Sequence, residues 1–366
     1  MSKKKSRLKL AQEQTETAIK KTNEKIGEMG TYTSLLYDEL NTIQEHFDEI
    51  RNVPSKKRLE YEELKQIRLN WKQQAEKIES DYKSAAAKNV AQGAAGVGAG
   101  VAVVALGPAA AMGIATTFGV ASTGTAISTL SGAAATNAAL AWLGGGALAA
   151  GGGGMVAGKA LLVLAGPVGW AIAGVALVSS GLLLWKGRND KKRLEDIFTL
   201  ISKRDVKSYE LAIVEINERI SRIEDECQKL HCAIERTRTL GLDYNLMTQA
   251  KQYELGSYVN LMNSSTQLLV NPIIGLQPKY DKDDLNEYIA FSRKEIDDKQ
   301  NSLIISLSNL LYTINLDERD KTLLWKSFKR NKKFLSSIEI AKEDFELSII
   351  EIVTDALNHK YRSERG

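Results

Sequence analysis

A long uncharged segment divides this chain and constrains its fold more than any other feature. Residues 89–158 contain no charged side chain, Lys159 interrupts the segment once, and residues 160–185 are again uncharged. Of the 28 glycines, 22 lie between Gly93 and Gly187, whereas both flanks are dense in charged residues. Apolar stretches longer than about 18 residues are typical of membrane spans. The sequence therefore predicts amphipathic helices over 1–90, a membrane-inserting module over 91–187 and a helical domain over 188–366.

The amino-terminal flank shows heptad spacing. Side chains that recur at alternating steps of three and four residues fall on one stripe of a long helix; here they are Thr33, Leu36, Leu40, Ile43, Phe47 and Ile50. Pro54 disfavours helix just before it, so this helix should end near Asn52, and Ser55 can cap a second helix. The second stripe includes Leu64 and Trp71. We expect these two helices to pack antiparallel.

The carboxyl-terminal flank continues the same pattern. Its longest seam consists of Ile213, Ile216, Ile220, Ile223, Cys227, Leu230 and Ile234. Gly241 is expected to end that helix, a further helix is expected over 244–270, and residues 271–284 are predicted to be a connector. Two more stripes follow: Leu285, Ile289, Ser292, Ile296, Lys299, Leu303 and Leu310, then Leu335, Ile338, Phe345, Ile349 and Ile352.

These stripes predict an all-α fold. A helix that is apolar on one stripe must bury it, so the flanks should pack together as a long bundle with coiled-coil contacts. The uncharged block would then be a Gly/Ala-rich membrane hairpin whose two ends return to the same place. Neither flank shows a convincing β-hairpin pattern.

Within the block, residues 93–119 and 159–186 are each long enough to cross about 30 Å of hydrocarbon as a helix. Small residues permit close helix contacts in lipid, prolines inside a span are tolerated, and tryptophan suits the interface. The residues predicted to mediate insertion and helix packing are Gly96, Gly100, Gly107, Pro108, Gly154, Gly158, Gly166, Pro167, Gly174 and Trp185. The alternative is that the glycines only form a flexible low-complexity linker.

Basic residues at the borders of the block predict its orientation. Those after the second span form an interfacial anchor: Lys186, Arg188, Lys191, Lys192 and Arg193. Positive charge at both borders places both flanks on the cytoplasmic side of the cell inner membrane, with an even number of spans. A polar stretch follows the basic residues 1–10 where a secretory signal would have an apolar core, so we expect synthesis in the cytoplasm.

Candidate chemical motifs are weak. Residues 153–160 match a phosphate-binding loop except at Ala160, which lacks the hydroxyl that holds magnesium. Cys227, His231 and Cys232 leave a zinc shell incomplete, and Cys227 lies on the heptad seam, which favours core packing. The basic run 326–333 is expected to be a solvated helix face, with anionic lipid headgroups as the alternative and nucleic acid as a minor one. We expect no enzyme activity, cofactor, metal, small-molecule substrate or nucleic acid partner.

In layout, long amphipathic helices on both sides of a hydrophobic hairpin resemble the α-helical pore-forming toxins of the cytolysin A type. The run from Ser131 to Gly154 is also similar to glycine-rich modules of uncharacterised bacterial membrane proteins. The resemblance implies a bacterial effector that inserts its apolar segment into a lipid bilayer as a homo-oligomer or with a related helical partner. The alternative is a constitutive two-span membrane protein whose cytoplasmic coiled coils act as a scaffold or sensor. An NTP-dependent enzyme is a third, weaker hypothesis, because it needs the incomplete phosphate loop.

Overall fold

The computed structural model describes residues 7–91, 143–144, 187–293, 296–330, 335 and 341–363. Within these ranges the chain is mostly helical and contains no strand, which confirms the all-α class. The helices are α1 (Arg7–Glu49), α2 (Ser55–Ala91), α7 (Arg188–Thr237), η3 (Tyr244–Leu246), α8 (Gln249–Val270), η4 (Ile274–Leu276), α9 (Lys282–Ser292), α10 (Asp298–Leu311), α11 (Glu318–Lys329) and α13 (Leu347–Ser363).

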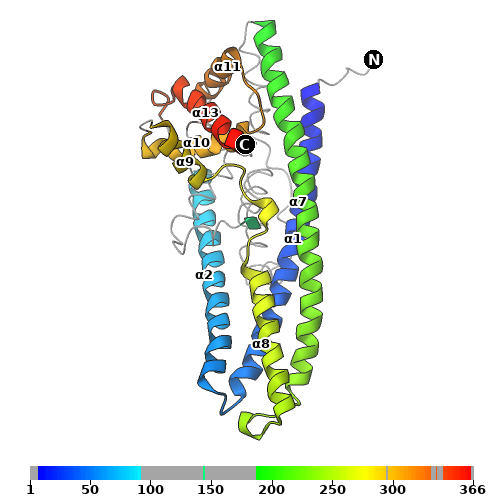
Figure 1. Cartoon of the computed structure of the whole chain (residues 1–366). Coiled ribbons are helices and arrows are strands. Elements are labelled where there is room, and N and C mark those ends of the chain that lie inside the picture. The colour runs from blue at the N-terminus through cyan, green and yellow to red at the C-terminus, as the bar shows by residue number, and fades with distance from the viewer. Residues whose placement is uncertain are drawn as a thin grey trace, which may run out of the picture.

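The longest contact joins α1 to α7, which run side by side in the same direction (Figure 1). Their hydrogen bonds join residues at a nearly constant separation in sequence. The Thr15 hydroxyl donates to the Ser202 carbonyl over 3.4 Å, 187 positions apart, and the Tyr32 hydroxyl donates to Glu224 Oε1 over 2.6 Å, 192 positions apart. A nearly constant offset along two helices is the signature of a parallel, in-register pair.

We call α1, α2, α8 and the second half of α7 the stalk. α2 and α8 return from the far end of α1 and α7, and they pack mainly against each other. All six seam residues predicted for α1, from Thr33 to Ile50, are buried. On α7 the predicted seam is buried from Ile216 to Ile234, and Ile213 is half-buried. The heptad interpretation is therefore confirmed for the α1 and α7 seams.

A second core forms what we call the head, which consists of α9, α10, α11, α13 and the first turns of α7. Its short helices have explicit starts. Asp281 and Asp284 form a capping box on α9, and Asp317 and Asp320 form another on α11, which satisfies N–H groups that the first turn leaves unpaired. Buried Asn309 joins the head to its connector by accepting hydrogen bonds from the amides of Lys279 and Tyr280.

The head departs from the sequence prediction at two places. The stripe predicted from Leu285 to Leu310 belongs to two helices, because α9 stops at Ser292 and Arg293 takes a left-handed conformation with φ of 52°. Phe345 does not lie on the final helix; it is fully buried in the segment that precedes α13. Both differences arise because the head consists of short helices that point in different directions and pack around one core. One apolar stripe in the sequence therefore does not correspond to one helix.

The structure also corrects the membrane prediction. Among the residues it describes, no helix is both long enough and apolar enough to cross a bilayer. The long helices carry charged residues at nearly every turn, and their single apolar stripe is buried against neighbouring helices. On this finding the predicted pore-forming function, the two-span alternative and the placement in the cell inner membrane are wrong.

Candidate functional site

Most residues predicted to act in the uncharged block lie outside the described ranges. They are Gly96, Gly100, Gly107, Pro108, Gly154, Gly158, Gly166, Pro167, Gly174, Trp185 and Lys186, together with the phosphate-loop motif 153–160 and both predicted spans. Of the predicted basic anchor, Arg188 begins α7, and Lys191, Lys192 and Arg193 follow in its first turns.

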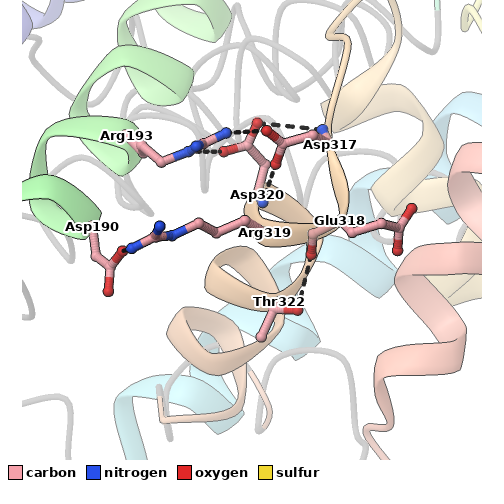
Figure 2. A network of polar contacts seen from close by, with 7 residues as sticks. All are labelled: Asp190, Arg193, Asp317, Glu318, Arg319, Asp320 and Thr322. Carbon is pink, nitrogen blue, oxygen red and sulfur yellow. Dashed lines mark hydrogen bonds and ion pairs between the residues drawn. The ribbon is translucent and has the colours of Figure 1, made fainter.

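Arg193 takes part in a network that ties the start of α7 to the start of α11 (Figure 2). Its Nε donates to Asp320 Oδ1 over 2.8 Å, and its guanidinium also pairs with Asp317. In return, Arg319 of α11 donates to Asp190 Oδ1 of α7 over 2.6 Å. The hydrogen bond from Asp320 N, followed by that from Arg193, lowers the pKa of Asp317. The network therefore fastens two helices of the protein to each other.

Between residues 92 and 186 the structure describes Leu143 and Gly144 only, and both pack inside the protein. The Ile273 amide donates to the Leu143 carbonyl over 2.7 Å, and the Leu143 side chain belongs to the stalk core. A Cβ atom on Gly144 would lie 2.5 Å from the Leu276 carbonyl oxygen. At this point, therefore, the uncharged block is seated against the α8–η4 connector so closely that only glycine fits.

Arg68 of α2 is a buried cation in the stalk, with 1% of its surface exposed. Its guanidinium donates to Gln44 Oε1 over 2.9 Å and to Thr266 Oγ1 over 3.2 Å, which links α2 to α1 and α8. No described carboxylate lies within ion-pair distance of it. Burial lowers the pKa of Arg68 to about 10, which keeps the side chain charged at neutral pH. The arrangement is a polar link between helices.

The three residues that were weighed as a metal site, and judged an incomplete one, do not converge. Cys227 is buried in the α7 seam, while Cys232 is exposed and His231 faces Glu39 across 3.8 Å. Burial raises the pKa of the Cys227 thiol to about 11. Within the described ranges, no group of three or more His, Cys, Asp or Glu residues could hold a metal ion. Cys227 therefore packs as a small apolar side chain.

The strongest candidate site lies at the far end of the stalk, where two turns meet. We define the tip as residues 51–59, from the α1–α2 turn into α2, and residues 238–253, from the α7–α8 loop into α8. The Arg51 amide donates to the Leu242 carbonyl over 2.9 Å, and the Tyr244 amide donates to the Arg51 carbonyl over 3.0 Å. The two turns are thus joined by a parallel β-bridge.

Local conformation explains why each turn reaches the other. Asn52 adopts a left-handed conformation with φ of 60° and holds both carboxylate oxygens of Asp243 through its amide. Gly241 has φ of 101°, a value that glycine adopts without strain. Lys57 of α2 donates to the Tyr244 hydroxyl over 2.8 Å. These contacts hold the backbone of the tip in one conformation.

The tip exposes large apolar side chains. Leu246 is 84% exposed and Leu242 is 55% exposed on the α7–α8 loop, and Leu59 at the start of α2 and Tyr253 at the start of α8 are also exposed. Single exposed leucines are ordinary, but a group gathered on one end of a molecule is typical of an interaction surface.

The tip is also strongly basic. It carries six basic residues against a single carboxylate, Asp243; the six are Arg51, Lys56, Lys57, Arg58, Arg238 and Lys251. Arg58 pairs with Glu62 and Arg238 with Glu235 in the adjoining helices, and Lys251 donates to two carbonyls of the loop. Neither Arg51 nor Lys56 forms an ion pair with any residue of the described ranges.

A groove of about 800 Å³ opens beside the tip between α1 and α2. Leu59 and Ile67 supply its apolar lining, whereas its charges largely satisfy one another: Lys65 pairs with Asp48 over 2.8 Å and Arg58 with Glu62 over 3.0 Å. Glu63 adds a third carboxylate to these two pairs, so the groove extends the apolar surface of the tip and carries a net charge of −1.

No family model, curated protein or solved structure matches this chain. Its function is therefore inferred from the geometry of the structure.

The tip was missed by sequence reasoning, although both of its turns were predicted as helix ends. Leu242 and Leu246 fall outside every heptad stripe, which marks them as apolar residues without a place in a helical seam. That pattern could have identified them. Their proximity to Arg51 could not be predicted, because it depends on α1 and α7 lying parallel.

Proposed function

We propose that this chain is a non-enzymatic helical scaffold that binds another protein through its tip. The observation that carries the proposal is the joining of two turns, about 190 positions apart in sequence, into one fixed surface that exposes leucines and free cations. A surface held in its binding conformation before a partner arrives loses little conformational entropy on binding. Aromatic and aliphatic anchors surrounded by polar residues are the usual anatomy of protein interfaces.

A photo-crosslinking amino acid at position 246 of the full-length chain tests this function in cells. We expect one discrete covalent adduct, because Leu246 would contact the partner. The matched control places the same amino acid at Leu211, which is 66% exposed on the outer face of α7 and away from the tip. The adduct from position 246 should disappear when Leu242→Asp is added and persist when Val214→Asp is added.

The mass of the adduct distinguishes the kinds of partner. A mass near twice that of the 40.2 kDa chain would identify a second copy, in agreement with the predicted homo-oligomer. Any other single mass would identify a different protein. The absence of an adduct at position 246, or the same adducts at positions 246 and 211, would show that the tip is not a docking surface.

A further inference from the structure

We infer that the partner presents to the tip an amphipathic helix whose polar rim is acidic. This inference rests on the proposed function and specifies the chemistry of the partner. Four of the six tip cations make no ion pair among the described residues. Of these, Lys57 and Lys251 donate to neutral oxygens, and Arg51 and Lys56 lie in the α1–α2 turn and at the start of α2. The exposed leucines Leu242 and Leu246 come from the loop that is bonded to the same turn.

One face of an amphipathic helix would supply both kinds of contact that the tip offers. An amphipathic helix presents apolar side chains along one stripe and charged side chains beside it. Leu242 and Leu246 would pack on the apolar stripe, while carboxylates of the rim would face Arg51 and Lys56. A basic rim is disfavoured, because like charges placed opposite each other across an interface oppose binding.

The number of free cations favours protein over nucleic acid or lipid. Proteins that bind duplex DNA commonly contact about six to ten phosphates, and basic segments that recognise anionic lipid commonly carry about four to eight Lys or Arg residues. Of the six basic residues of the tip, Arg58 and Arg238 are neutralised by Glu62 and Glu235, whereas Lys57 and Lys251 donate to neutral oxygens and keep their charge. The four cations that no described carboxylate neutralises lie below the range of duplex binders and at the lower end of the lipid range, and beside exposed leucines they fit a protein interface, in which charge supplies specificity and apolar contact supplies most of the area.

The test uses the purified full-length chain and two fluorescent synthetic helices. Both carry leucines along one face; one has glutamates on the rim and the other has lysines at the same positions. Fluorescence anisotropy should show saturable binding of the acidic helix and roughly tenfold weaker binding of the basic one. The acidic helix should compete with the adduct formed at position 246.

The decisive measurement reverses the charge of Arg51 and Lys56. In the double variant Arg51→Glu/Lys56→Glu, affinity for the acidic helix should fall by roughly tenfold and affinity for the basic helix should rise. The matched control Lys203→Glu/Lys207→Glu reverses two exposed lysines on α7, away from the tip, and should change neither. Arg51 forms the backbone bridge to the α7–α8 loop through its main-chain atoms, so circular dichroism and thermal denaturation must show that the double variant stays folded. The single variant Lys56→Glu lies outside the bridge and should shift both affinities in the same directions by a smaller factor.

Three outcomes would overturn the inference. They are equal binding of both helices, no binding of the acidic helix, and binding of anionic phosphatidylserine vesicles or a duplex DNA that exceeds binding of the acidic helix. If the adduct at position 246 still forms under any of these outcomes, the tip remains a docking surface and only the acidic chemistry is wrong. If the adduct is also absent, the proposed function fails with the inference.

Discussion

The stalk and the head bury their apolar residues by different means. In the stalk, α1 and α7 lie parallel over most of their length, and one heptad stripe on each supplies the core. In the head, short helices meet at varied angles (Figure 1), and their starts are fixed by aspartate caps rather than by periodicity. The comparison shows that a long periodic seam specifies register, whereas short helices depend on individual caps and buried polar contacts.

The two regions also use arginine differently. Arg68 of the stalk is buried and bonded to neutral side chains, whereas Arg193 at the edge of the head is partly exposed and bonded to carboxylates. A buried cation depends on every hydrogen bond that it makes, because removal from water is costly. An exposed ion pair is weakened by salt and by competing water. Substitution of Arg68 should therefore lower the stability of the stalk, whereas a higher ionic strength should weaken the contacts of Arg193 in the head.

The largest expected effects come from truncating one buried side chain in each of the two cores. Leu40→Ala in the stalk should lower the free energy of unfolding by about 2–5 kcal/mol, and Phe345→Ala in the head by about 3–5 kcal/mol, because both side chains are fully buried. Hydrogen exchange should rise mainly within the region that carries the substitution, since the two cores are separate clusters. Equal acceleration throughout both regions would show that stalk and head unfold as one unit.

The two arginines give the next test of the comparison. Arg68→Ala leaves Gln44 and Thr266 without their buried donor, which should cost about 1–3 kcal/mol for each stranded group with little dependence on salt. Arg193→Ala should produce a smaller loss in the denaturation midpoint. That loss should vanish in about 1 M NaCl, where exposed charges are screened within a few ångströms. A salt-independent effect at Arg193 would contradict its assignment as a surface contact.

Two glycines sharpen the account of the uncharged block. Gly144→Ala places a Cβ 2.5 Å from a backbone oxygen, so we expect overpacking to lower the free energy of unfolding by about 1–3 kcal/mol. Gly27 lies within α1 with no atom near its would-be Cβ, and Gly27→Ala should stabilise by about 1 kcal/mol. Thermal denaturation monitored by circular dichroism measures both. If Gly144→Ala stabilised the protein as Gly27→Ala should, the packing at Leu276 would be refuted.

The smallest expected effect is a difference in reactivity between the two cysteines of α7, and its measurement needs no substitution. Cys227 lies on the seam with a pKa of about 11, so at pH 8 only about one thiol in a thousand is the reactive thiolate. Cys232 is exposed on the same helix. Iodoacetamide should therefore modify Cys232 first, as followed by mass spectrometry of the peptides. Similar rates at the two positions would mean that the α7 seam opens readily.

Sequence periodicity predicted the stalk well because its burial repeats every three or four residues. The stripes from Thr33 to Ile50 and from Ile216 to Ile234 are buried as expected, and Pro54 and Gly241 lie in the turns that follow α1 and α7. The head was predicted less well, since α11 was not recognised as a separate helix and Phe345 was assigned to the wrong element. Its boundaries depend on Asp281 and Asp317, local caps that the apolar periodicity used for the prediction does not record.

The membrane prediction failed for a different reason. It was drawn from the composition of residues 89–185, and it took no account of contacts that the flanks could offer to an apolar segment. At Leu143 and Gly144 the structure supplies such contacts, through Ile273 and Leu276 of the protein itself. Composition alone does not distinguish an apolar residue that faces lipid from one that packs against protein.

The central claim is that the parallel register of α1 and α7 brings their turns together at one tip. Spin labels at Lys56→Cys and Asn245→Cys, with Cys227 and Cys232 replaced by serine, test it by double electron–electron resonance on the full-length chain. The account predicts a separation no greater than about a third of the roughly 65 Å spanned by the 43 residues of α1 at 1.5 Å each. A distance close to that full length would place the two turns at opposite ends and contradict the account.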